Sequence, residues 1–252
     1  MNINKLKLEL IAQRKSKFKG NIYHYSQVNF AYNSNKIEGG RLTEDETEEI
    51  FETDSFIPKS DTAIKLDDLI EMKNHFRLFD YTLDIIDKPL SKEIMIDMNK
   101  ILKRNTTDEE NPRYNVGGFK VVPNKIGLIN VINTSKPEDV EKDLDILISE
   151  YEEMDEITLE DIIDFHYKFE LIHPFQDGNG RVGRMIILKQ CLDNNIIPII
   201  IRDDNKAEYY RSLNKAQHEN DYSSLVKYFQ KEQKYYVDNT EKMLFAYEEL
   251  EK

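Results

Sequence analysis

The sequence predicts a mainly helical protein, built as one domain or as one domain with an added helical arm. Apolar residues recur at helical spacing through most of the 252 residues. The seven prolines each fall at a break in that spacing, as expected of residues that end helices. Only residues 118–133 read as a β-hairpin. A hydrophobic content of 39% is sufficient for a sizeable core at this length.

The expected helices are recognised from their apolar spacing and from the residues at their ends. A glycine pair at Gly39 ends the first of them. Thr43 with Glu46, and Thr158 with Asp161, have the spacing of capping boxes at helix starts. The expected helices cover residues 22–38, 44–52, 64–86, 92–103, 137–151, 159–172, 180–193 and 203–246.

The remaining segments are the N-terminus and the hairpin. Residues 1–20 carry six Lys and Arg residues against one acidic residue, and we interpret them as a solvated arm or a helix face. In the hairpin region, FKVV, PNKIG and LINVI succeed one another, which favours two strands joined by a turn.

Composition excludes several classes of protein. A net charge of −13 argues against binding to duplex nucleic acid, which normally needs a basic stripe. No run of 18 apolar residues is present and the N-terminus lacks an apolar signal segment, so we expect neither a membrane span nor secretion. Cys191 is the one cysteine, which rules out an intrachain disulfide. We therefore expect a cytoplasmic protein, of bacterial origin.

The glycines are concentrated where the backbone must turn or approach a ligand. Eight of the nine lie at positions 39–40, at 117–118 with 127, and at 178, 180 and 183. The third group belongs to the segment LIHPFQDGNGRVGR, residues 171–184, which carries the strongest functional signal in the chain.

This segment contains the parts of a phosphate-binding site. Successive amides at Gly178, Asn179 and Gly180 can form an anion nest at the start of a helix. Arg181 and Arg184 are three residues apart, so both lean to one side and can hold a polyphosphate. Asp177 is an oxygen ligand suited to Mg²⁺, and His173 can take a proton from an attacking hydroxyl.

Residues 173–184 match at every defined position the signature HPF-x-[D/E]-G-N-[G/K]-R-x-x-R, and the chain resembles the Fic (Fido) family over about residues 25–232. The resemblance implies a helical fold with a central helix-loop-helix active site and a β-hairpin flap. It also implies transfer of AMP from ATP to a Ser, Thr or Tyr hydroxyl of a protein, with release of pyrophosphate. His173 would then be the general base, Asp177 would hold Mg²⁺ or Mn²⁺, Asn179 would stabilise the α-phosphate, and Arg181 and Arg184 would bind the outer phosphates. The whole turn would contact the nucleotide: Asp177, Gly178, Asn179, Gly180, Arg181, Val182, Gly183 and Arg184.

Two further segments resemble parts of the family's nucleotide site. GGFKVVPNKIG resembles the flap, which would align the target's backbone by strand addition and cover the nucleotide. Tyr209 and Tyr210, followed by Gln217, resemble the helix that closes the nucleoside pocket, with Gln217 in place of an Asn. Ordinary aromatic packing is the alternative for this pair. The flap residues implied to contact nucleotide are Asn124, Lys125, Ile126 and Gly127.

Ser34 and Glu38 fit the family's inhibitory motif, [S/T]-x-x-x-E-[G/N], and they precede the signature. The resemblance implies the class with an N-terminal inhibitory helix, here residues 25–39. In that class the glutamate pairs with the second arginine, Arg184, and prevents productive binding of ATP. A carboxylate at the C-terminal end of a helix is unfavourable without such a partner.

We therefore expect an N-terminal arm at 1–24, a Fic domain at 25–232 and a helical extension at 233–252. ATP is the expected substrate, a protein is the expected target, and self-modification and homo-oligomers are compatible with the sequence. Two alternatives stay open: an enzyme of this fold that removes AMP or uses another nucleotide donor, and a non-catalytic adaptor that responds to nucleotide.

Overall fold

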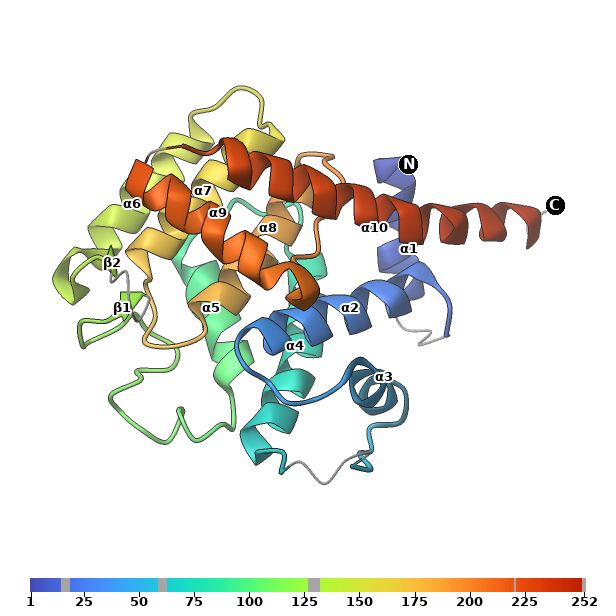
Figure 1. Ribbon diagram of the computed structural model, residues 1–252, viewed down its shortest axis with the longest axis horizontal. Coiled ribbons are helices and arrows are strands. Elements are labelled where there is room, and N and C mark those ends of the chain that lie inside the picture. Colours follow the sequence, from blue (N-terminus) through green and yellow to red (C-terminus); the bar gives the residue numbers. More distant parts are fainter. Residues whose placement is uncertain (15–18, 59–62, 127–131, 220, 251–252) are drawn as a thin grey trace.

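The computed structural model describes residues 1–14, 19–58, 63–126, 132–219 and 221–250. This part of the chain contains ten α-helices, two 3₁₀ turns and one two-stranded sheet (Figure 1), so the expected mainly helical fold is confirmed. The α-helices are α1 (Ile3–Gln13), α2 (Ile22–Ile37), α3 (Glu44–Thr53), α4 (Leu66–Asp84), α5 (Lys92–Lys103), α6 (Val140–Glu152), α7 (Leu159–Ile172), α8 (Asn179–Asp193), α9 (Lys206–Glu219) and α10 (Ser223–Leu250). The strands are β1 (Lys125–Ile126) and β2 (Ile132–Asn133), and the 3₁₀ turns are Pro137–Asp139 and Asp203–Asn205.

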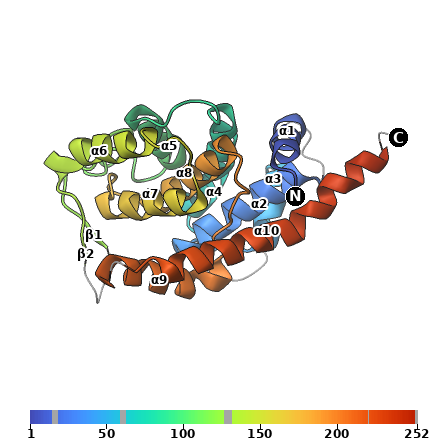
Figure 2. The ribbon, with the colours of Figure 1, turned by 90° about the horizontal axis from the view of Figure 1, so that it is seen from above.

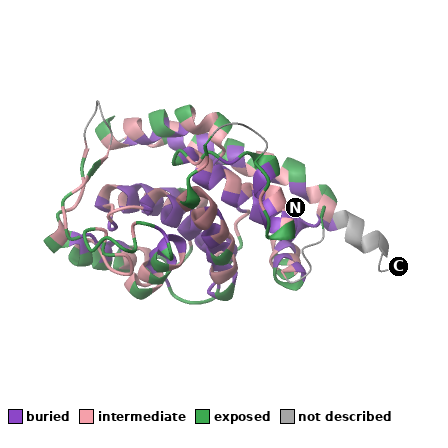
Figure 3. Cartoon of the chain, turned by 90° about the horizontal axis from the view of Figure 1, so that it is seen from below, coloured by how far each residue is buried: buried purple, intermediate pink, exposed green. Residues whose placement is uncertain are grey.

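Helices α7 and α8 lie at the centre of the bundle. Seen from above, α5 and α6 lie on one side of this pair and α9 and α10 on the other (Figure 2). Every residue of α8 from Arg181 to Leu192 is buried, which Figure 3 shows as part of the purple band through the middle of the molecule. A helix buried on all sides needs neighbours all round. The two signature arginines are therefore held inside the protein and not on its surface.

The helix ends follow from local chemistry. Thr43 and Glu46 form a reciprocal capping box at the start of α3, and Thr158 and Asp161 form another at the start of α7, both as expected. Asn21 accepts the N–H of His24 at 2.7 Å and so begins α2. These caps fix where α2 and α7 begin, and α2 and α7 carry the inhibitory motif and His173.

The N-terminal segment is a packed helix, so of our two interpretations the solvated arm is wrong and a helix with one packed face is what the structure contains. Leu6 and Leu10 of α1 are fully buried in the main core, with α2 and α10 as neighbours. Two fully buried leucines contribute roughly 2–3 kcal/mol each to folding. The two lysines of α1 are partly buried beside this apolar face, where Lys5 donates to the Leu244 carbonyl at 2.8 Å and Lys7 lies 3.8 Å from the Asp87 carboxylate.

The hairpin is shorter than the sequence indicates. β1 and β2 are antiparallel and pair Lys125 with Asn133 and Ile126 with Ile132. Residues 119–122, which we expected to be a strand, are irregular. Their region is tied to the signature loop instead, because the Lys120 N–H donates to the Pro174 carbonyl at 2.8 Å. Pro123 follows and has no N–H to offer to a ladder.

The segment 203–246 is also not one continuous helix. A 3₁₀ turn at Asp203–Asn205 leads into α9, and α10 starts at Ser223, whose N–H is accepted by the Asp221 carboxylate at 2.9 Å. The boundary that we expected at residue 232 falls inside α10. Among the described helices, none combines the length and the apolar character needed to cross a bilayer.

Candidate active site

The turn between α7 and α8 begins at a residue in a rare backbone conformation. His173 ends α7 with φ at 51°, in the left-handed region, and its N–H still donates to the Phe169 carbonyl at 2.9 Å. Histidine is among the few non-glycine residues enriched in this region. Pro174 prevents the helix from continuing. The chain therefore turns sharply and leaves the His173 side chain about one-fifth exposed at the helix end.

The turn is then locked by its own side chains. The Phe175 N–H donates to Asn179 Oδ1, and Asn179 Nδ2 donates to the Phe175 carbonyl, both at 2.8 Å. Phe175 itself is buried in the core. Gly178 has φ at 87°, and a Cβ there would come within 3.1 Å of Leu102. Glycine is needed at 178 for both reasons. The Asn179 amide is committed to the loop and does not point freely toward a ligand.

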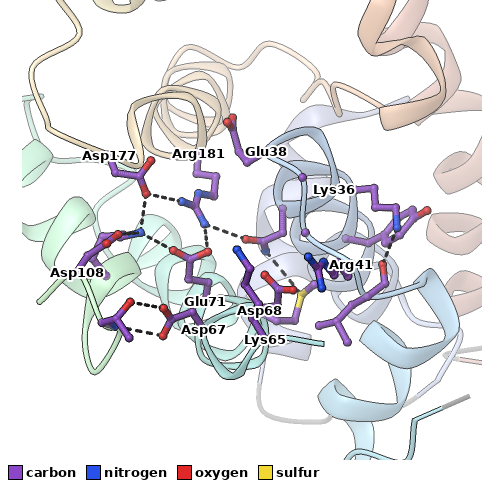
Figure 4. A pocket seen from close by; sticks show the side chains of 18 of the residues that line it. Lys36, Glu38, Arg41, Lys65, Asp67, Asp68, Glu71, Asp108, Asp177 and Arg181 are labelled. Carbon is purple, nitrogen blue, oxygen red and sulfur yellow. Dashed lines mark hydrogen bonds and ion pairs between the residues drawn. The ribbon is translucent and has the colours of Figure 1, made fainter. Parts of the chain in front are cut away.

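Two cavities meet at this turn and share Glu38 in their linings. The loop cavity, of about 420 Å³, contains Glu71, Lys103, Asp177 and Arg181 in its wall (Figure 4). The histidine cavity, of about 410 Å³, has in its wall Ile126, Glu170, His173, Gly180, Arg184 and Tyr210. Each volume is in the range of a small-molecule site.

Arg184 is held by the end of α2. Its Nη2 donates to Glu38 Oε1 at 2.7 Å and to the Ser34 carbonyl at 3.0 Å, and its Nε donates to Ser34 Oγ at 2.9 Å. Arg184 is 5% exposed. Gly180 makes this contact possible, because any Cβ at that position would collide with the Glu38 carboxylate. The Nε and Nη2 atoms of Arg184 are therefore both engaged by the end of α2.

His173 is neutral at physiological pH. Burial lowers the pKa of His173 to about 4, and the Lys120 ammonium acts in the same direction. Its Nδ1 lies 3.8 Å from Glu170 Oε2, one turn earlier on α7. Burial raises the pKa of Glu170 to about 7, although Arg184 opposes the shift. A neutral imidazole facing a cavity can accept a proton from a hydroxyl there.

Asp177 and Arg181 belong to a network of charges on the loop-cavity side (Figure 4). Arg181 Nη2 lies 3.0 Å from Asp177 Oδ2, and its Nη1 lies 2.5 Å from Glu71 Oε2. The Lys103 ammonium joins Glu71 and Asp177, at 2.5 Å from each. Burial opposes ionisation of Asp177, but Arg181 and Lys103 prevail and lower its pKa. Asp177 is therefore ionised, and its charge is balanced in this structure by Lys103 and Arg181.

The base of the hairpin is fixed to the same turn by a buried lysine. Lys120 is 2% exposed, and its ammonium donates to Asn124 Oδ1 and Thr134 Oγ1 at 2.8 Å and to the Ile172 carbonyl at 3.1 Å. Asn124 Nδ2 donates to the Phe175 carbonyl at 2.9 Å. Burial lowers the pKa of Lys120 to about 8. The base of the flap is therefore bonded directly to the chain on both sides of His173.

Helix α9 forms another wall of the histidine cavity. Tyr209 is buried, and its hydroxyl lies 2.7 Å from His166 Nε2. Tyr210 is 45% exposed and lines the cavity together with Asn214 and Gln217. Tyr209 also lines this cavity, so both tyrosines belong to its wall, one buried and one partly exposed.

The comparisons with known proteins agree on one family. The Fic/DOC family model matches residues 89–191, which include α5, the flap and the whole signature turn. Residues 89–191 are therefore assigned to the Fic/DOC family. It is 28% identical over 194 residues to the protein adenylyltransferase Fic of Nematostella vectensis, and 28% identical over 193 residues to the protein adenylyltransferase fic-1 of Caenorhabditis elegans. Each match covers 74% of this chain, but only 42% and 36% of these relatives.

Solved structures share the Fic fold along nearly the whole chain. A Fic domain containing signaling protein from Bacteroides thetaiotaomicron has a TM-score of 0.75 and 20% identity, over 97% of this chain and 96% of that one. A Fic family protein from Desulfovibrio desulfuricans has a TM-score of 0.69 and 21% identity, over 97% of this chain and 74% of that one. At this identity the likeness concerns the fold alone.

Most of the residues that we expected in the Fic site do lie around the two cavities. His173, Gly180, Arg184, Ile126 and Gln217 line the histidine cavity, and Asp177 and Arg181 line the loop cavity. Lys125 is exposed on β1, and Gly127 lies outside the described residues.

Two expected residues face away. Val182 is fully buried in the core. Its N–H donates to the Gly178 carbonyl in the first turn of α8 and is not free for a ligand. Gly183 packs against α7, where a Cβ would lie 2.9 Å from Glu170 Oε1. We expected nucleotide contacts from both, and the structure gives them packing roles instead.

Several residues of the Fic site escaped the sequence analysis. Glu71 and Lys103 come from α4 and α5, far from the signature, and no motif indicates them. Glu170 lies three residues before His173, so its place on the same helix face was a usable signal.

Proposed function

We propose that this Fic domain is a protein adenylyltransferase that transfers AMP from ATP to a Ser, Thr or Tyr hydroxyl. The observation that carries the proposal is the neutral His173 in the wall of a nucleotide-sized cavity. Gly180, at the start of α8, lines the same cavity. Relatives bearing the name protein adenylyltransferase support the same reaction.

In the proposed reaction the target hydroxyl attacks the α-phosphorus of ATP. A P–O bond to the target forms, the bond between the α- and β-phosphates breaks, and pyrophosphate leaves. His173 takes the hydroxyl proton as the attack proceeds, which its low pKa permits at neutral pH. Most of the rate then comes from positioning and charge neutralisation, as in other phosphoryl transfers.

The nucleoside occupies the histidine cavity in this proposal, between Tyr210 and the flap residue Ile126. The phosphates lie at the start of α8, where unpaired amides and the helix dipole attract anions. Arg184 and Arg181 reach the outer phosphates once they are free of Glu38 and Glu71. The reaction therefore needs a rearrangement of both arginines.

A divalent cation fits this site. Asp177 is an ionised carboxylate with a side chain 46% exposed toward the loop cavity, and oxygen ligands of this kind suit Mg²⁺ or Mn²⁺. Such an ion neutralises charge on the phosphates when bound. Asp177 would hold it from the protein side.

Glu38 is the proposed brake, in the manner of the Fic class with an N-terminal inhibitory helix. While Glu38 and Ser34 hold the Nε and Nη2 atoms of Arg184, this arginine is unavailable to the γ-phosphate. The target is a protein whose backbone pairs beside the flap, and this chain is itself a candidate target. Removal of AMP by the same site remains the alternative, since Glu38 lines the cavity of His173.

Mass spectrometry of the Glu38→Gly protein after incubation with ATP and Mg²⁺ tests the proposal. An AMP adduct on this protein or on an added protein lysate, absent after His173→Ala, would support it. No adduct from a panel of nucleoside triphosphates, despite binding of ATP, would contradict it. Release of AMP from a modified target, with no incorporation, would favour the alternative.

A further inference from the structure

Lys103 occupies an unusual position at the end of α5. Its side chain is 4% exposed, and its ammonium lies among three carboxylates. Glu71 Oε1 and Asp177 Oδ2 are each 2.5 Å from Nζ, and Asp108 forms the third ion pair. The partners come from α4, from the loop after α5 and from the signature turn (Figure 4).

The three carboxylates are spaced like the ligands of one cation. One oxygen from each lies within 4.8 Å of the others. Ligand oxygens on opposite sides of a bound Mg²⁺ or Ca²⁺ are separated by about 4–5 Å. In this chain the centre of that arrangement is taken by an ammonium, which carries one charge and cannot bridge to phosphates as a metal ion does.

The charges of the group do not cancel. Lys103 and Arg181 supply two positive charges, and Glu71, Asp108 and Asp177 supply three negative charges, which leaves a net charge of −1. Such a group attracts cations even with Lys103 in place. It would attract them more strongly without it, because the net charge would become −2.

We propose that Lys103 is a positioning residue that acts as the resident counter-ion of Asp177 and competes with the divalent cation for its carboxylate. The inference rests on the proposed function, in which Asp177 holds the metal ion of the nucleotide. Lys103 holds the carboxylate of Asp177 in place while no metal ion is bound. It must give up or share Asp177 when the metal–nucleotide complex binds, and so it raises the metal concentration that the enzyme needs.

Contacts of α5 with the backbone of the turn support a positioning role. Asn99 Nδ2, one helical turn before Lys103, donates to the Asp177 carbonyl at 2.9 Å. Gly178 packs on Leu102 of the same helix. Helix α5 thus holds both the backbone and the carboxylate of Asp177, and only the carboxylate contact is ionic.

The test measures nucleotide binding with and without metal. The protein is the full chain with Glu38→Gly, and the probe is an ATP analogue with a methylene bridge between the α- and β-phosphates. Isothermal titration gives the Kd of the analogue in EDTA and in saturating Mn²⁺. The quantity compared between variants is the Kd in EDTA divided by the Kd in Mn²⁺. A fraction of unfolded protein does not change this ratio.

Lys103→Met should increase the ratio by about tenfold or more, because Mn²⁺ then meets no competing charge at Asp177. Lys103→Arg keeps the charge and should stay near the parent value. Lys100→Met, an exposed lysine on the same helix, is the matched control and should leave the ratio unchanged. Electron paramagnetic resonance of Mn²⁺ should show the same shift in metal affinity.

An unchanged ratio for Lys103→Met would overturn the inference, whether the variant binds nucleotide normally or weakly in both conditions. The double variant Lys103→Met with Asp108→Asn keeps the net charge at −1 and guards against loss of folding. Its ratio should rise too, since direct competition at Asp177 is removed. Failure of the parent Glu38→Gly protein to bind the analogue at all would instead refute the proposed function.

Discussion

Replacing Glu38 by glycine should release Arg184 and raise the rate of AMP transfer. The change removes the one carboxylate that pairs with Arg184 among the described residues, and it leaves the two Ser34 contacts in place. Glu38 follows the last residue of α2, outside the helix interior in which glycine is most destabilising. The variant should therefore stay folded with its arginine free to turn toward a phosphate.

The size of the effect follows from this contact. Arg184 Nη2 and Glu38 Oε1 are 2.7 Å apart, and the Glu38 side chain is 34% exposed. A hydrogen bond between charged groups contributes about 1.5–3 kcal/mol, and screening by solvent reduces it here to about 1–2 kcal/mol. Since 1.36 kcal/mol corresponds to a factor of ten, we expect transfer to rise about 5- to 30-fold.

The assay is incorporation of label from α-³²P-ATP, followed as an initial rate. Glu153→Gly is the matched control. Glu153 is the C-terminal cap of α6 and follows Ser149 by four residues, and the Ser149 hydroxyl donates to Glu153 Oε1 at 3.3 Å. Glu153 is exposed and faces no arginine in the described part of the chain. Equal rates for Glu38→Gly and the unmodified protein, with equal nucleotide binding, would refute the reasoning.

Four other variants or conditions give sharp outcomes. His173→Ala should lower transfer by about 10²- to 10⁴-fold while titration calorimetry finds nucleotide binding retained; loss of both would argue for a structural role. Because the pKa of His173 is lowered to about 4, the neutral base persists in acid. In the Glu38→Gly, Glu170→Gln protein, which lacks the neighbouring carboxyl with its pKa of about 7, the rate should therefore stay level from pH 7 to 5 and fall only near pH 4; a fall centred at pH 6.5 would contradict this. His75 is fully buried, and burial lowers its pKa to about 3, so the unfolded chain binds a proton below pH 6.5 that the folded protein does not, and the free energy of unfolding falls with pH. His75→Phe should therefore reduce the loss of stability between pH 7 and 5 by about 2 kcal/mol, measured by urea unfolding. An unchanged loss would show that His75 is not its source. Lys120→Met should free the flap and remove a positive charge near His173, which lowers transfer and moves the acid limb of the rate profile to higher pH; an unmoved limb would separate Lys120 from His173.

Much of the fold and of the site could be predicted because the decisive residues are close together in the sequence. The capping boxes at Thr43 and Thr158 depend on residues three positions away, and the helix starts follow from them. The signature turn likewise holds its own conformation through Phe175 and Asn179. The partner of Arg184 was predicted from the Fic resemblance, and the structure has Glu38 in contact with it.

Tertiary neighbours decided what the sequence could not indicate. Val182 lies between Arg181 and Arg184 in the first turns of α8, but the neighbouring helices enclose its side chain in the core. Lys103 ends an ordinary amphipathic helix, and only the approach of α4 and the signature turn brings three carboxylates to it. Leu6 and Leu10 lie in a strongly basic segment, so their burial depends on α10, more than 200 residues later.

Glu38 lines both cavities, so its carboxylate limits how far a phosphate chain bound beside His173 can extend. Under the proposed function, a nucleoside monophosphate fits beside His173 without disturbing the glutamate. A triphosphate must push the carboxylate aside to extend past Arg184. The resting protein should therefore retain AMP better than ATP, so an excess of AMP over ATP would keep the enzyme inactive, although the proposed reaction itself releases pyrophosphate and not AMP.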